Sequence, residues 1–274
     1  TVEIAAPTAR GLFAKAIMQS GTPGFGMPPR PLASALALGD QADKLLGAGG
    51  SIATMRARPV AALLAADLKI SDSSIISDDF RWLRSVIDGA VLPRPPRQLL
   101  AEAPRRPVII GTNRAEFGPA AGEVDWDKDL RATFGADAAK AREFYRATDP
   151  RMGIPEMQYW TDWLFRCPAG RVAALLAGKG APVWRYEFDL SRDGGLTSHN
   201  ADISYIFNDI VFGTNVSLQR YWINFARSGD PNGKGLPSWP RFDPGARRHV
   251  LFDSRGVTQD AKLRESTCAM LEEL

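Results

Sequence analysis

The stretch that decides the fold is Pro107-Val108-Ile109-Ile110-Gly111-Thr112-Asn113-Arg114-Ala115-Glu116. It opens with β-branched, apolar residues that end at a glycine, which predicts a strand at 107–111. Because this run is apolar without alternation, it is typical of a strand buried on both faces of a parallel sheet. Polar residues follow at once, so the Glu116 carboxylate is expected just beyond the carboxyl end of that strand.

The rest of the chain alternates between strand and helix patterns. Further strands are predicted at 16–20, 183–188 and 249–253, and helices at 6–16, 33–47, 51–66, 128–146, 155–178, 216–227 and 259–273. Strands that alternate with helices indicate an α/β fold with a mostly parallel central sheet. The 274 residues fit one large domain of this kind.

Composition excludes several function classes. Lys and Arg number 34 against 31 Asp and Glu, a net charge of +3, so nucleic acid or an anionic membrane surface is not an expected partner. No apolar run approaches the roughly 20 residues that cross a bilayer. The two cysteines, Cys167 and Cys268, make neither a disulfide framework nor a zinc site and are interpreted as small buried hydrophobes.

Two histidines limit the search for a general base. His199 lies in the Gly-rich segment 194–202, after the strand predicted at 183–188, where α/β enzymes place catalytic groups. A purely structural role for His199 stays open on this pattern alone. His249 begins a predicted strand after Arg247-Arg248 and is interpreted as a surface residue.

Glu116 is the second candidate, since a carboxylate there can accept a hydrogen bond from an imidazole. An acid that precedes the histidine fits the α/β-hydrolase order of nucleophile, acid and base, with the nucleophile on a G-x-S-x-G turn. Ser20 lacks the preceding glycine. Ser51 in Gly49-Gly50-Ser51-Ile52-Ala53 matches most of the pattern, but it follows no strand and is interpreted as a helix N-cap. The sequence therefore supplies an acid and a base without a nucleophile.

Ordered segments along nearly the whole chain resemble the C-terminal half of the type B carboxylesterase/cholinesterase family, near the para-nitrobenzyl esterases. These segments are 10–21, 86–89 with Leu92-Pro93, 111–116, 199–207, and 221–232 with 237–240. The chain departs from the family pattern at Ala115, Phe117, Asn200 and Asp202, where relatives have Asp, an immediate Gly, Gly and Glu.

The resemblance implies an α/β-hydrolase fold and a serine esterase that acts on a small or aryl carboxylic ester, with no metal or organic cofactor. It assigns Glu116 as catalytic acid and His199 as catalytic base. It places Ser20 and Asp202 behind them as hydrogen-bonding partners. Phe25 and Met27 fall in the loop that lines the acyl pocket of relatives, and are expected to contact substrate.

The resemblance also predicts that the nucleophilic serine and the oxyanion glycines lie upstream of Thr1, so that the N-terminal half of the same enzyme is a partner. Two alternatives stay open: a catalytically silent binding or adhesion domain, and an inactive truncated fragment. The chain lacks the six-cysteine set of secreted animal relatives, which favours a bacterial-type enzyme. The compartment (cytoplasmic, periplasmic or secreted) is undetermined.

Overall fold

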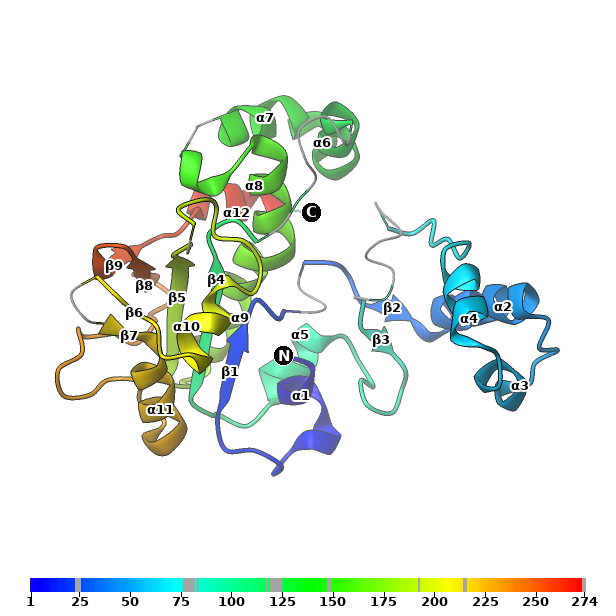
Figure 1. Ribbon diagram of the computed structural model, residues 1–274, viewed down its shortest axis with the longest axis horizontal. Coiled ribbons are helices and arrows are strands. Elements are labelled where there is room, and N and C mark those ends of the chain that lie inside the picture. Colours follow the sequence, from blue (N-terminus) through cyan, green and yellow to red (C-terminus); the bar gives the residue numbers. More distant parts are fainter. Residues whose placement is uncertain are drawn as a thin grey trace.

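The computed structural model describes residues 1–22, 26–75, 82, 84–116, 118, 125–146, 149–191, 193–213 and 216–272. Its centre is a five-stranded sheet with the order β1-β4-β5-β8-β9 (Figure 1). The strands are β1 (Ala16–Gln19), β4 (Val108–Asn113), β5 (Val183–Asp189), β8 (Arg248–Asp253) and β9 (Gly256–Ala261). The first four are mutually parallel, and β9 pairs antiparallel with β8. The predicted α/β architecture is therefore confirmed.

Helices cover both faces of the sheet. Val108 and Ile110 of β4 pack in one core with α1 (Val2–Ala5), α5 (Pro96–Glu102) and α9 (Cys167–Gly178). The alternate residue, Ile109, points to the opposite core. That second core contains α10 (Ala201–Phe207) and α11 (Leu218–Ser228), which lie on the other side of the sheet from α9 (Figure 1). Successive side chains of β4 thus point into opposite cores. This explains why the whole length of β4 is buried.

Close packing in the second core accounts for the glycine that ends the apolar run of β4. A Cβ atom added at Gly111 would lie 2.1 Å from the Tyr186 ring of the neighbouring strand β5. Only glycine therefore lets that ring lie flat across β4, and Tyr186 is fully buried as a result.

A third core lies at one end of the sheet. It is built from α6 (Trp126–Phe134), α7 (Ala138–Arg146), α8 (Pro155–Thr161), the π-helix Asp162–Arg166 and α12 (Glu265–Glu272). A disulfide joins Cys167 at the start of α9 to Cys268 in α12. The interpretation of the cysteines as unpaired hydrophobes was therefore wrong, because two segments 101 residues apart in sequence pack side by side here.

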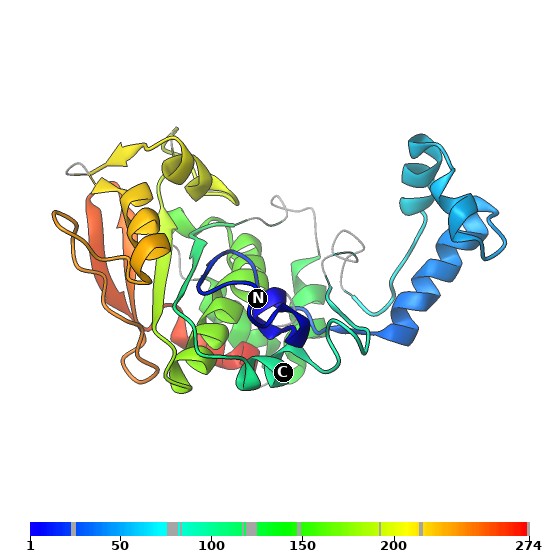
Figure 2. The ribbon, with the colours of Figure 1, turned by 90° about the horizontal axis from the view of Figure 1, so that it is seen from below.

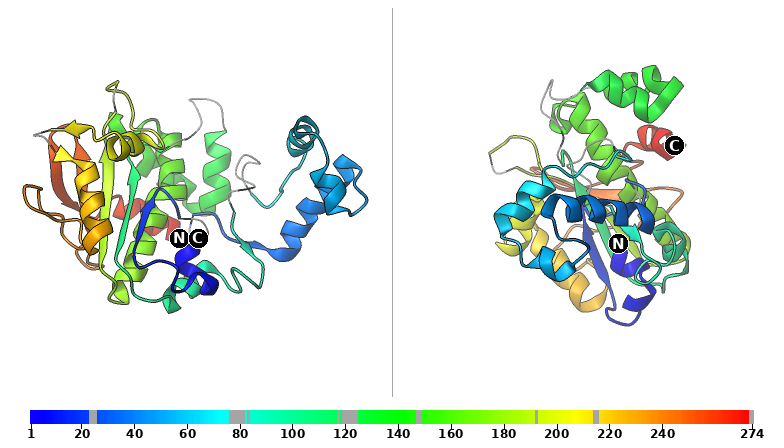
Figure 3. Two further views of the ribbon diagram at one scale, coloured as in Figure 1. Left: turned by 60° about the horizontal axis from the view of Figure 1, so that its bottom comes forward. Right: turned by 90° about the vertical axis from the view of Figure 1, so that its right-hand side faces the viewer.

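A helical arm projects away from the sheet (Figures 1 and 2, and the left view of Figure 3). It comprises α2 (Leu32–Leu46), α3 (Ile52–Arg56) and α4 (Val60–Asp67), and it joins the body through the pair β2 (Arg30–Pro31) and β3 (Val86–Ile87). Ser51 caps α3 by accepting a hydrogen bond from the Thr54 amide, as predicted. Large apolar side chains on the arm are exposed: Leu32, Leu36, Leu45, Ile52, Val60, Leu63, Leu64 and Leu68. A short hairpin, β6 (Val211–Phe212) with β7 (Val216–Ser217), precedes α11.

Several predicted elements differ from the structure. The helix expected at 6–16 is only α1 and a 3₁₀ turn at Pro7–Ala9, because Gly11 turns the chain with φ near +90° before β1 begins. The helix expected at 259–273 shrinks to α12, and the residues before it form β9 as a hairpin with β8. The helix expected at 128–146 is split into α6 and α7 at Gly135.

His249 is not a surface residue. It lies in β8 between β5 and β9, opposite Asp260, and is 1% exposed. Because the missed strand β9 pairs with β8, His249 does not lie on an edge strand of the sheet. Within the described residues, no helix is long and apolar enough to span a bilayer.

Candidate active site

The candidate residues meet at the carboxyl edge of the parallel strands, where α/β proteins place their ligands. Ser20 directly follows β1, Glu116 follows β4 after a two-residue turn, and His199 lies in the loop after β5. The register explains the convergence, because Gln19 of β1 pairs with Gly111 and Asn113 pairs with Phe188 of β5. Three loops from three adjacent strands therefore start at the same edge.

Glu116 is fully buried and held on both carboxylate oxygens. Its Oε1 accepts the Asn113 amide at 2.7 Å and the Ser20 hydroxyl at 2.5 Å. Its Oε2 lies 2.6 Å from Nδ1 of His199. A buried carboxylate needs such donors to offset the cost of its burial, and here every donor also fixes its direction.

His199 is anchored by main chain as well as by side chain. Its amide donates to the Glu116 carbonyl at 2.5 Å, while the side chain keeps 33% of its surface exposed. The hydrogen bond with Glu116 raises the pKa of His199 above its usual 6.5. The ring of Phe165 packs against the imidazole, with the two ring centres 5.3 Å apart. The contact with Glu116 thus engages Nδ1 of His199 and orients the ring.

Asp202 lies beside the Glu116–His199 pair and makes its side-chain hydrogen bonds with two other residues. It is buried and its Oδ2 accepts hydrogen bonds from the Gln19 amide group at 2.8 Å and the Tyr186 hydroxyl at 2.9 Å. Trp222 in turn donates its indole N–H to the Gln19 oxygen at 3.2 Å. The charge of Asp202 also contributes to the raised pKa of His199.

Of the two residues expected to line the acyl pocket, Phe25 and Met27, the structure describes only Met27. Phe25 lies outside the described residues. Met27 is half-buried and packs against the third core. Among the described residues, no group of three or more His, Cys, Asp or Glu side chains could hold a metal ion.

The comparison with protein families matches residues 1–271 to the model described as the carboxylesterase family. The chain belongs to the carboxylesterase family. Its mostly parallel sheet with helices on both faces is the α/β-hydrolase fold of that family.

Curated relatives of this carboxylesterase-family chain include cocaine esterase of Homo sapiens, 28% identical over 88% of the chain and 49% of the relative. Carboxylesterase 1E of Mus musculus is 28% identical over 100% of the chain and 57% of the relative. Acylcarnitine hydrolase of Rattus norvegicus is 28% identical over 95% and 53%. The chain thus spans about half the length of the curated relatives it matches.

Asn200 shows how this carboxylesterase-family member tolerates a departure from the pattern. The residue stands where the resemblance in sequence led us to expect glycine, and its φ of +67° lies in the left-handed region. Asparagine is among the few residues that adopt this conformation at modest cost. Asn200 can therefore join His199 to the start of α10 in this conformation.

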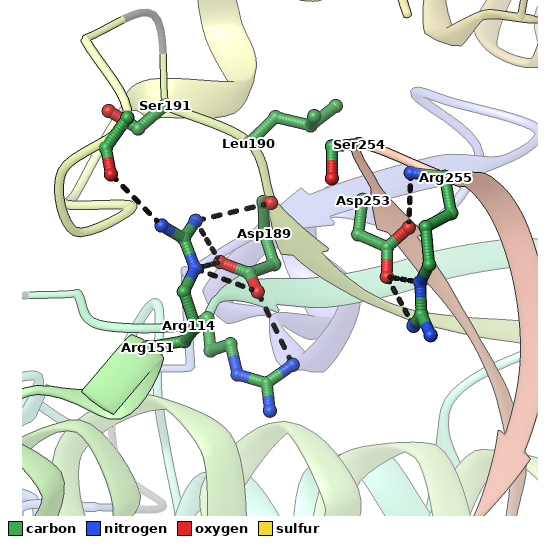
Figure 4. A pocket seen from close by; sticks show the side chains of 9 residues that line it. Arg114, Arg151, Asp189, Leu190, Ser191, Asp253, Ser254 and Arg255 are labelled. Carbon is green, nitrogen blue, oxygen red and sulfur yellow. Dashed lines mark hydrogen bonds and ion pairs between the residues drawn. The ribbon is translucent and has the colours of Figure 1, made fainter. Parts of the chain in front are cut away.

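Behind the acid loop lies a cavity of about 470 Å³ at the carboxyl ends of β5 and β8 (Figure 4). Ion pairs occupy its walls: Arg151 binds Asp189 at 2.6 Å, and Arg255 binds Asp253 at 2.6 Å. Arg151 also donates to the Gly195 carbonyl at 2.8 Å in the loop that leads to His199. We interpret these charges as supports for the histidine loop.

Sequence reasoning missed the groups that hold the site from behind. Gln19 and Tyr186 fix Asp202, and Phe165 packs on His199. Gln19 directly precedes Ser20, so its place beside a candidate was a usable signal. Phe165 comes from a helical segment 34 residues earlier in the chain than His199, and no local pattern connects the two.

Proposed function

We propose that this chain supplies the acid and base of a serine carboxylesterase. The observation that carries the proposal is the contact between Nδ1 of His199 and Oε2 of the fully buried Glu116, 2.6 Å long. It joins a buried acid to a partly exposed base at the edge of the sheet where the family's fold places its chemistry. The order of acid and then histidine along the chain supports it further.

In the proposed mechanism a serine hydroxyl attacks the ester carbonyl while Nε2 of His199 takes the hydroxyl proton. Glu116 accepts the Nδ1 hydrogen bond, which keeps the ring oriented and stabilises the imidazolium. The same proton passes to the departing alcohol, and an acyl-enzyme forms. His199 then activates a water molecule that hydrolyses the acyl-enzyme. These steps require no metal or organic cofactor.

We further propose that the nucleophile and the oxyanion donors come from residues outside this chain, in the remaining half of the enzyme. Two features support this. No G-x-S-x-G pattern occurs in the 274 residues. In addition, no strand of the described part of the chain pairs with β1 on the side away from β4, so the sheet can be extended there. The exposed leucines of the helical arm offer further apolar surface for the rest of the enzyme to cover.

The substrate class we propose is a small or aryl carboxylic ester. Relatives named for cocaine and for acylcarnitine differ in what they are named to act on, so they support the common bond type rather than one ester. Met27, which packs against the third core, is proposed to contact the acyl group, together with Phe25 two residues earlier in the sequence.

The test is ester turnover by the complete enzyme with His199→Ala. We expect kcat to fall by several orders of magnitude, because loss of a triad member leaves only binding and the oxyanion hole, roughly 10³–10⁴-fold over water. The matched control is His249→Gln at pH 8, where the other histidine of the chain is uncharged and remote from the proposed chemistry. Near-normal kcat in His199→Ala would rule out the proposed base.

A further inference from the structure

One short segment contacts all three loops of the candidate site. In the π-helix Asp162–Arg166, Phe165 packs on the His199 ring, and Arg166 donates from Nη2 to the Arg114 carbonyl in the acid loop at 2.5 Å. The loop after β1 also rests on this segment. The Thr22 hydroxyl donates to the Leu164 carbonyl at 3.4 Å. A π-turn carries one more residue than an α-turn, and such turns occur frequently at functional sites.

Arg166 is the group in this segment with no obvious reason to be buried. Its side chain is 0% exposed, as is that of Asp162. Its Nε donates to Glu187 Oε1 at 3.1 Å, and its Nη1 donates to Asp162 Oδ1. Burial alone would lower the pKa of Arg166, but the charges of Asp162 and Glu187 raise it, so the guanidinium stays ionised.

The third contact of the guanidinium is the informative one. Two carboxylates already neutralise Arg166, yet its remaining edge is aimed at a main-chain carbonyl two residues before Glu116. A buried ion pair is in itself weak evidence for stability, because desolvation offsets its attraction. The same planar fork is well suited to fixing a position, since each of its nitrogens binds a separate element.

We propose that Arg166 is a positioning residue for the Glu116–His199 pair: it ties the acid loop to the π-helix, whose Phe165 holds the imidazole. This inference rests on the proposed function only for its effect on turnover. The tether fixes where the acid loop leaves β4, and Phe165 fixes the ring that Glu116 must meet. A shift of about 1 Å in such a contact can cost up to roughly 100-fold in rate.

The experiment compares Arg166→Lys, Arg166→Met and Arg264→Met in the complete enzyme. Lysine keeps a positive charge between Asp162 and Glu187, but it cannot bind three elements at once. Arg264 is the matched control, because it also binds Asp162, with its Nε 3.0 Å from Oδ2, from the other side. Two readouts are taken: kcat and KM for an aryl acetate across pH, and the pKa of His199 by NMR, with His199→Ala to assign the signal.

We expect Arg166→Lys to melt near the wild-type temperature and yet to lose roughly 10–100-fold in kcat with little change in KM. The pKa of His199 should move down towards 6.5 in both Arg166 variants, since the contact with Glu116 that raises it is loosened. The charges that face His199 are those of Glu116 and Asp202, and neither is changed. Arg264→Met should lose stability without this shift.

The inference is overturned if Arg166→Lys keeps kcat within twofold and leaves the pKa of His199 in place. It is equally overturned if Arg264→Met shifts that pKa as far as Arg166→Met does, because the effect would then belong to the ion-pair network as a whole. Failure of the proposed function looks different: His199→Ala would remain active. In that case the NMR measurement of the His199 pKa would still decide the role of Arg166. If Arg166→Met fails to fold, the comparison of Arg166→Lys with wild type decides it instead.

Discussion

His249 should make the folded protein sensitive to mild acid. Burial, reinforced by the nearby charge of Arg185, lowers the pKa of His249 from 6.5 to about 4. In the unfolded chain His249 is therefore protonated below about pH 6.5, whereas in the folded chain it is protonated only below about pH 4. The stability that neutral His249 contributes at pH 7 is therefore lost as the pH falls from about 6.5 to about 4, and little more is lost at lower pH.

The size of the effect follows from the two pKa values. With one pKa unit worth about 1.36 kcal/mol, the stability lost at this residue between pH 7 and pH 5 is about 2 kcal/mol, and close to 3 kcal/mol by pH 4. His249→Gln removes the titration while keeping a polar side chain of similar size in β8. The variant should therefore lose about 2 kcal/mol less than wild type between pH 7 and pH 5.

Urea unfolding of both proteins, followed by tryptophan fluorescence at pH 7 and pH 5, measures this difference directly. The other titrating groups are common to the two proteins, so they cancel in the comparison. Parallel loss of stability in wild type and His249→Gln would show that His249 is protonated in the folded state, or is reached by water, and the reasoning from its burial would be wrong.

Three further outcomes are expected. Replacing Cys167 and Cys268 by Ser should lower stability by about 2–5 kcal/mol, because the bond closes a long loop; thermal melting with and without reductant checks this. Gly111→Ala should cost about 1–3 kcal/mol by pushing the ring of Tyr186 aside, seen as a lower unfolding midpoint in urea. Asp202→Ala should lower the free energy of unfolding by about 1–3 kcal/mol, because the Tyr186 hydroxyl loses its acceptor. Asp202→Asn should keep most of the stability. Equal loss in both variants would contradict the hydrogen-bond argument.

The sheet could be predicted from the sequence because its strands carry local signals. The apolar run of β4 and the alternation of β5 reflect burial on one or two faces, which leaves a pattern within a few residues. β9 carried no such signal. Its residues are partly polar, since it is an edge strand, and only its pairing with β8 makes it a strand. His249 was misplaced for the same reason.

Some residues of the candidate site could likewise be predicted from local sequence, and others could not. Glu116 and His199 each follow a strand, so position along the chain placed them at one edge of the sheet. Arg166 and Phe165 approach that edge from a helix, and their role depends on which way an irregular turn faces. The disulfide between Cys167 and Cys268 likewise depends on α12 folding back onto α9. Contacts between distant segments leave no trace in residue spacing, so these parts had to come from the structure.

The π-helix also sets a rule for changes in chain length. Because the wide turn holds one residue more than an α-turn, deleting one residue from 162–166 would return the turn to α-helical hydrogen bonding and remove one side-chain position from the segment. Phe165 and Arg166 could then no longer face His199 and the acid loop together while α8 and α9 stay packed. A point substitution in this segment changes one contact, whereas a single-residue deletion changes which side chains the turn presents to the site. Libraries of variants that scan deletions rather than substitutions should therefore find few tolerated deletions here, although the segment lies far from Glu116 and His199 in sequence.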